Sequence, residues 1–192
     1  MDKRSFEPRQ NLTEDDIVQR IRPLSSMLQQ EYLENLLQRL NLDSNLKIFS
    51  SRKLADLYAR RGMYASAARI ITNAAMAAPT FALKKDLCME AGMMAIKAGN
   101  YLLADDSFRH AGEEAPLHEK EKIKREAQDL FMFEAEQLEK KGRIARAVQL
   151  YEKTLREDRT DESLKQIKEK LVVLYERLGK IDDSLRMRDS LR

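Results

Sequence analysis

Apolar residues along this chain recur at intervals of three and four positions, in stretches that are separated by short polar turns. This spacing is typical of amphipathic helices, and no stretch shows the two-residue alternation of a half-buried strand. It predicts helices over about residues 13–22, 24–40, 44–61, 64–78, 80–98, 101–114, 117–141, 144–157, 163–178 and 181–191. The chain is therefore expected to be all-α, with short connections that make consecutive helices antiparallel.

A repeated series of residues runs through the middle of the chain. It reads first as Gly62, Tyr64, Ala67, Ile71, Ala74 and Pro79. It returns as Gly99, Tyr101, Ala104, Phe108, Ala111 and Pro116. The two glycines are 99 − 62 = 37 residues apart, and weaker echoes begin at Gly142 and Gly179. Repetition at such a period predicts helical hairpins stacked in series.

Small residues recur where the two helices of each hairpin should come closest. In the second helices these are Ala67, Ala104 and Ala147, and in the first helices they are Ala55, Gly92 and Ala135. Larger residues follow four positions later in the second helices, at Ile71, Phe108 and Tyr151. This alternation predicts tight helix pairs locked by one large side chain each.

This pattern resembles the tetratricopeptide repeat (TPR) family, whose unit is a helical hairpin of about 34 residues. The first unit matches the family pattern at Ser51, Leu54, Ala55, Tyr58, Ala67, Ile71 and Pro79, and the second at Cys88, Ala91, Gly92, Ala95, Ala104, Phe108 and Pro116. A third unit matches less fully and a fourth has a poor second helix. The resemblance implies an all-α, TPR-like helical-hairpin solenoid of about 3.5–4 repeats. The spacings of 37 and 142 − 99 = 43 imply helices longer than the family standard.

Three segments are expected along the chain. Residues 1–12 are polar and interrupted by Pro8, and they are expected to form a mobile tail. Residues 13–42 form an N-terminal helical extension, in which Thr13 and Asp16 resemble a capping box. Residues 43–192 form the TPR-like repeat domain. The helix from Leu24 to Leu40 either covers the exposed end of the first repeat or forms a homodimer, and the cover is favoured because terminal repeats need capping.

Composition narrows the class of protein. The 192 residues are 43% hydrophobic and carry 35 basic and 32 acidic side chains, a formal net charge of +3. This near balance makes nucleic acid an unlikely partner. No run approaches the ~20 apolar residues of a membrane span, and the N-terminus lacks the apolar core of a signal peptide. With Cys88 as the single cysteine, a reducing, cytoplasmic location is expected.

Residues for catalysis or for metal binding are sparse. The two histidines, His110 and His118, have no second histidine or cysteine at the spacing of metal ligands. Cys88 lies in an apolar helix without a neighbouring histidine, so it is interpreted as core filler. No phosphate loop, nucleophile elbow or dinucleotide-binding motif is present. We therefore expect that the chain is not an enzyme and that it holds neither a cofactor nor a metal ion.

The TPR resemblance implies that the first helices of the hairpins line a concave, partner-binding face. The residues placed there include Phe49, Arg52, Asp56 and Glu90, and the predicted partner contacts are Lys53, Arg60, Met89, Met93, Ile96, Met132, Phe133, Lys140 and Val173. The expected partner is a protein, bound as a peptide or an amphipathic helix.

Met89, Met93 and Ile96 give the second repeat an additional apolar face at helical spacing. That face would bind the partner, because methionine adapts to varied apolar surfaces. The apolar face is explained equally well if the N-terminal helix or a neighbouring helix covers it. Two other functions stay open: a nucleic-acid-binding helical repeat, favoured by Arg52, Lys53 and nearby basic residues but opposed by interleaved acids, and a self-assembling structural protein.

Overall fold

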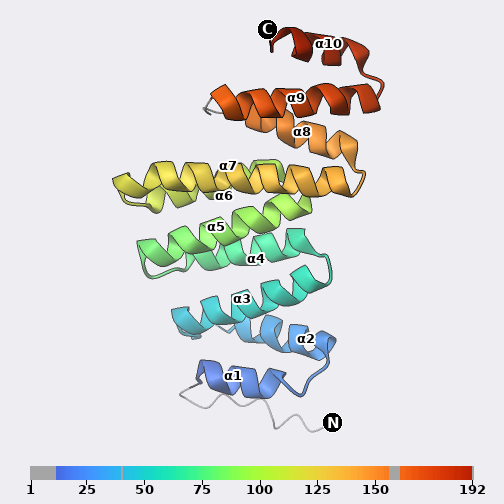
Figure 1. Ribbon diagram of the computed structural model, residues 1–192. Helices are drawn as coiled ribbons and strands as arrows, with labels where there is room; N and C mark the ends of the chain where they lie inside the picture. The colour runs from blue at the N-terminus through green and yellow to red at the C-terminus, as the bar shows by residue number, and fades with distance from the viewer. Residues whose placement is uncertain (1–11, 40, 156–160, 192) are drawn as a thin grey trace. The chain divides into compact units, whose positions relative to one another are not determined.

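The computed structural model describes residues 12–39, 41–155 and 161–191, and these residues form ten α-helices and no strand (Figure 1). The helices are α1 (Glu14–Ile21), α2 (Ser26–Leu37), α3 (Ser44–Arg60), α4 (Tyr64–Met76), α5 (Phe81–Ala98), α6 (Tyr101–Glu114), α7 (Leu117–Lys140), α8 (Ile144–Leu155), α9 (Asp161–Arg177) and α10 (Ile181–Asp189). This confirms the all-α prediction, and most predicted ends lie within about two residues of the observed ones.

The helices belong to two compact units. Unit 1 comprises residues 1–120 and contains α1 to α6 with the first turn of α7, and unit 2 comprises residues 121–192. Inside unit 1, α2 packs on α3, α3 on α4, α4 on α5 and α5 on α6. Inside unit 2, α8 packs on α9 and α9 on α10. Packing between sequence neighbours is what short connections between helices produce.

Local sequence fixes the helix ends. The predicted capping box is present, since the Asp16 backbone nitrogen donates to Thr13 Oγ1 at 3.2 Å and the Thr13 nitrogen donates to Asp16 Oδ2 at 3.1 Å. Gly62 and Gly99 follow α3 and α5 with φ of 74° and 77°, the left-handed conformation that glycine adopts without steric cost. These glycines let each first helix turn directly into its antiparallel partner.

The N-terminal extension covers the first hairpin of unit 1. Ile17 of α1 and Leu33 and Leu36 of α2 are buried together with Leu54 of α3. Tyr32 and Ile21 complete this cluster, so the apolar stripe of α2 serves the core of its own chain. Because this stripe is buried within the chain, the structure favours α2 as a cover of the first repeat over α2 as a dimerisation helix. Self-association stays a prediction. Residues 1–11 and position 40 lie outside the described residues, and the predicted mobile tail falls almost entirely on them.

Small residues form the seams between helices, as predicted. Ala67, Ala104 and Ala147 are fully buried. Gly92 of α5 lies against the ring of Phe108 of α6, where an added Cβ would be 2.3 Å from the nearest ring atom. Glycine is therefore the residue that allows α5 and α6 to approach around that ring.

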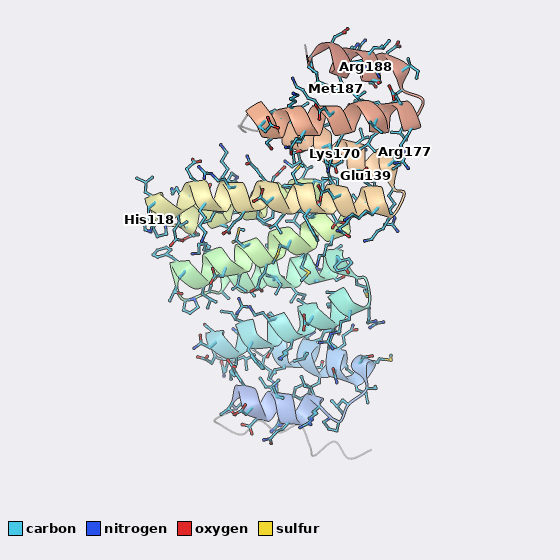
Figure 2. All side chains as sticks on the ribbon, viewed as in Figure 1. His118, Glu139, Lys170, Arg177, Met187 and Arg188 are labelled. Carbon is cyan, nitrogen blue, oxygen red and sulfur yellow. The ribbon has the colours of Figure 1, made fainter. Side chains whose placement is uncertain are left out.

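The last hairpin, α9 and α10, combines a buried small residue with polar contacts. Ser184 of α10 is buried at the position that alanine occupies in earlier second helices. Arg188 of α10 donates to Glu176 of α9 at 2.6 Å, and Arg188 is labelled in Figure 2. The Tyr175 hydroxyl donates to Glu152 of α8 at 2.6 Å. These contacts tie the final helix to the rest of unit 2.

Candidate functional site

A pocket of about 300 Å³ lies among α3, α4 and α5 in unit 1. It is lined by Phe49, Arg52, Lys53, Ala55, Asp56, Ile71, Glu90 and Met94. The α3 residues at positions 49, 52, 53 and 56 are spaced i, i+3, i+4 and i+7, so helix geometry places them on one face. Glu90 and Met94 are likewise four residues apart on α5. Two first helices thus turn their facing sides toward a shared hollow.

The pocket has an apolar floor. Ala55 and Ile71 are almost completely buried, and Phe49 and Met94 are half-buried at the sides. The floor can therefore accept an apolar group and release its water, which is favourable by about 25 cal/mol for each Å² of apolar surface buried. A volume near 300 Å³ is at the lower limit of small-molecule sites and has room for one or two amino-acid side chains.

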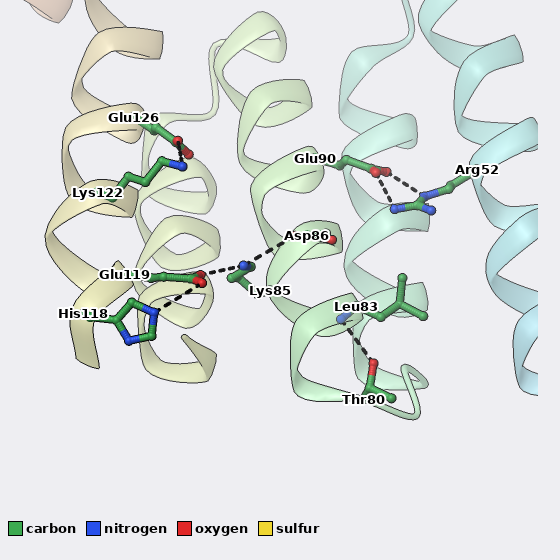
Figure 3. Close-up of polar contacts among 10 residues, drawn as sticks. All are labelled: Arg52, Thr80, Leu83, Lys85, Asp86, Glu90, His118, Glu119, Lys122 and Glu126. Carbon is green, nitrogen blue, oxygen red and sulfur yellow. Dashed lines mark hydrogen bonds and ion pairs between the residues drawn. The ribbon is translucent and has the colours of Figure 1, made fainter. Parts of the chain in front are cut away.

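An ion pair joins the two first helices at the rim of the pocket. The Arg52 guanidinium on α3 donates to both carboxylate oxygens of Glu90 on α5, with Nε 3.1 Å from Oε2 (Figure 3). A bidentate arginine–carboxylate pair fixes orientation as well as distance. A second link, also shown in Figure 3, joins Lys85 of α5 to Glu119 in the first turn of α7 at 2.7 Å.

The other charged residues of the rim differ in how they are paired. Asp56 lies 3.5 Å from Arg60, one turn further along α3. The Lys53 ammonium lies 5.3 Å from the centroid of the Phe49 ring, which is within the range of a cation–π contact. Among the residues that the structure describes, no carboxylate forms an ion pair with Lys53. Lys53 thus holds a positive charge above an aromatic wall of the pocket.

The structure brings only some of the predicted contact residues to this pocket. Lys53 lines the pocket, and Arg60 forms an ion pair with the pocket residue Asp56. Met89 and Met93 are half-buried and do not line it. Ile96 is 4% exposed and belongs to the core of α5, so we remove it from the proposed contact surface. Because α5 packs against both α4 and α6, its two apolar faces are largely covered within the chain.

Sequence reasoning missed Met94. The methionine stripe was placed on positions 89, 93 and 96, whereas the pocket uses the face that contains Glu90. The signal that could have found Met94 is its position four residues after Glu90, because Glu90 was already expected on the concave side.

The remaining predicted contacts belong to unit 2. Phe133 on α7 and Val173 on α9 are 59% and 54% exposed, and Lys140 is exposed at the end of α7. Met132 is half-buried, and its sulfur accepts a hydrogen bond from Thr154 Oγ1 at 3.4 Å. Phe133 and Val173 therefore present exposed apolar surface, whereas Met132 packs against Thr154 of α8.

In unit 2 a polar network lies between α7 and α9. The Tyr151 hydroxyl of α8 donates to Glu139 of α7 at 3.1 Å and accepts from Lys170 of α9 at 3.3 Å; Glu139 and Lys170 are labelled in Figure 2. Lys170 also donates to Glu136 of α7 at 2.7 Å. Burial raises the pKa of Tyr151 to about 12, so the phenol stays protonated. The pKa of Lys170 is raised because its bonds to Glu136 and Tyr151 outweigh the opposing effect of burial.

Within the described residues, the histidines and the cysteine do not gather into a metal-binding group. In residues 12–39, 41–155 and 161–191, no three histidine, cysteine or acidic side chains could hold a metal ion. His110 lies on the exposed face of α6, where its Nδ1 is 2.9 Å from Glu113. Burial raises the pKa of the Cys88 thiol, which makes it less reactive. No helix in the described ranges is long and apolar enough to cross a membrane.

No protein-family model matches this sequence, and no curated protein is significantly similar to it.

Proposed function

We propose that this chain is a non-catalytic scaffold whose TPR-like hairpins bind a peptide or an amphipathic helix of a protein partner. The binding site is the pocket among α3, α4 and α5. The observation that carries the proposal is the combination of an apolar floor with charged residues at the rim, on the faces of successive first helices. Such a surface supplies apolar affinity and polar specificity, which is how grooves recognise helices.

The hairpin pattern supports the same proposal. Helical repeats present long faces made of successive first helices, and α3 and α5 hold equivalent places in the first two repeats. The Arg52–Glu90 pair keeps these two helices at a fixed distance. A preformed pocket loses less conformational entropy on binding than one that must be assembled.

The methionine stripe at Met89 and Met93 contributes less than the sequence suggested. Both side chains are half-buried, and neighbouring helices account for much of that burial. The proposed contact is therefore centred on Met94. Phe133 and Val173 in unit 2 are proposed as further contacts of a partner, because both are exposed apolar residues.

The test is selection of a random peptide library, displayed on phage, against the purified full chain. The tightest peptides are then titrated against Met94→Asp, Met93→Asp and Met76→Asp. A charge in the pocket should weaken binding by roughly tenfold or more for Met94→Asp. Met76 is 80% exposed and does not line the pocket, so Met76→Asp is the matched control and should bind as the unchanged chain does.

Each variant should keep the helical circular dichroism of the parent, which separates loss of the site from loss of folding. If all three variants bind the selected peptides equally well, the pocket is not the binding site. If Met93→Asp alone abolishes binding, the partner uses the methionine stripe that the sequence predicted.

A further inference from the structure

Positive charge is concentrated on the helix that forms one wall of the pocket. Helix α3 contains four basic residues, Lys47, Arg52, Lys53 and Arg60, and one acidic residue, Asp56. Its net charge is therefore 4 − 1 = +3, equal to the formal charge of the whole chain. The charges of the rest of the sequence therefore cancel, and α3 stands out as a cationic helix.

Among the cations that line the pocket, Lys53 is the one for which the described residues provide no carboxylate partner. Arg52 is neutralised by two bonds to Glu90, and Asp56 is paired with Arg60. Lys53 makes its contact with the Phe49 ring, and no described carboxylate pairs with it. An ammonium group beside an apolar floor gains most from a carboxylate that arrives together with an apolar group, because the apolar group excludes water from the pair.

We propose, building on the scaffold function above, that the bound segment is an acidic amphipathic helix or peptide. One large apolar side chain of this segment enters the pocket over Ile71 and Met94. An aspartate or glutamate of the same segment, three or four residues from the apolar side chain, pairs with Lys53. On a helix these two positions lie on one face, which matches the side-by-side arrangement of the pocket floor and the Lys53 ammonium.

A polyanion such as nucleic acid would also be attracted to α3, but the pocket fits it less well. Glu90 and Asp56 stand at the rim and would repel a row of closely spaced phosphates more strongly than the single carboxylate that a peptide places on Lys53. Glu90 already occupies the guanidinium of Arg52, which is the group best suited to bind a phosphate. The apolar floor has no role in such a contact, whereas it gives a peptide its main binding energy.

The experiment compares three parallel selections of one random peptide library: on the full chain, on Lys53→Glu and on Lys180→Glu. Lys180 is the matched control, because its ammonium also lies over an aromatic ring, 5.9 Å from the Tyr175 centroid, but in unit 2. Sequencing should show that the full chain and Lys180→Glu enrich acidic residues three or four positions from a large apolar residue. Lys53→Glu should lose this enrichment or enrich basic residues instead.

Titration of a selected peptide gives the magnitude. Lys53→Gln should weaken binding by roughly two- to fivefold, the value of a partly exposed ion pair, and Lys53→Glu should weaken it further. Circular dichroism of the variants confirms that they fold. The loss of affinity on substitution of Lys53 should be smaller at high salt, because the ion pair between Lys53 and the peptide carboxylate is not fully buried.

Three results would overturn this inference. If the selected peptides depend on Met94 but show no acidic enrichment, the partner is not acidic, while the scaffold function stands. If binding ignores both Met94→Asp and Lys53→Glu, the pocket itself is excluded and the scaffold proposal falls with it. If random oligonucleotides bind more tightly than the peptides and Lys53→Glu abolishes that binding, the ligand of α3 is a nucleic acid.

Discussion

The hairpins of unit 1 and unit 2 place different side chains at one repeated position. Ile71 of α4 lies on the floor of an open pocket between α3 and α5. Tyr151, at the equivalent position of α8, is fully buried and reaches α7 and α9 with its hydroxyl. We attribute the difference to the size of this residue, because the larger Tyr151 side chain extends between successive first helices whereas Ile71 leaves room for the pocket.

Each of the two units has an ion pair that joins successive first helices. Arg52–Glu90 joins α3 to α5, and Lys170–Glu136 joins α7 to α9. Phe108, at the same repeated position in α6, lies with its ring against Gly92 of α5. Ion pairs between successive first helices thus occur in both units. Under the proposed function, the pocket of the first repeat is the part of this construction that would bind a partner.

The largest effect on stability should come from Tyr151→Ile. This change removes the ring and leaves Lys170 and Glu139 without the hydroxyl, which should destabilise unit 2 by about 2–4 kcal/mol. Urea unfolding, followed by circular dichroism, measures the change. The control Tyr151→Phe keeps the ring and should cost only about 1 kcal/mol. Equal losses for the two variants would mean that the ring does not fill a packed space.

Gly92→Ala should have the next largest effect. Alanine favours helix by about 1 kcal/mol over glycine, yet its Cβ would collide with the Phe108 ring, and overpacking costs about 1–3 kcal/mol. A lower midpoint of thermal unfolding is expected. Adding Phe108→Leu should restore part of the loss in the double variant. A Gly92→Ala chain more stable than its parent would show that the ring moves aside freely.

Alkaline pH should weaken unit 2 through its buried phenols. Burial raises the pKa of Tyr151 to about 12, above the ordinary value of about 10. Burial and then the bond to Glu152 raise the pKa of Tyr175 as well. Because the folded state keeps protons that the unfolded state releases, this stabilisation is complete below about pH 10 and is lost as the pH rises toward about 12. Urea midpoints across this range should fall.

The tyrosinate absorbance provides the matching control for this pH effect. Tyr151→Phe should remove one late-titrating tyrosine and make the fall in stability shallower. An unchanged pH dependence in that variant would contradict the proposed role of the Tyr151 phenol.

Ile71→Tyr should change stability least, by within about 1 kcal/mol, because the added ring can enter the open pocket. It converts the first repeat toward the filled arrangement of Tyr151. Binding of the library-selected peptides should fall by roughly tenfold or more, as measured by fluorescence anisotropy. If Ile71→Tyr binds them normally, the open space over Ile71 is not where the partner docks.

The helices were predictable from the sequence because local signals define them. Gly62 and Gly99 end α3 and α5, and Thr13 caps α1 through hydrogen bonds to a residue three positions away. The alanine seams were also predictable, because a small residue that recurs at one point of each hairpin indicates that the two helix axes come close there.

The candidate site was predicted only in part. The TPR resemblance placed Phe49, Lys53 and Glu90 on one face. It put Met93 rather than Met94 beside them and counted Ile96, which is buried, among the partner contacts. A helix with apolar residues on several faces does not reveal which neighbour covers each face. Ile71 and Tyr151 likewise look equivalent in the sequence, since the volume left between helices depends on packing that spacing does not define.

The most direct measurement is a nuclear magnetic resonance titration of the full chain, with methyl-labelled methionine, using the tightest selected peptide. The nine methionines include Met94, which lines the pocket, and Met76 of unit 1 and Met187 of unit 2, which do not line it. The Met94 methyl resonance should shift strongly and saturate with the peptide, while the resonances of Met76 and Met187 stay in place. Saturable shifts at Met187 or Met132 with none at Met94 would contradict docking in the pocket of unit 1.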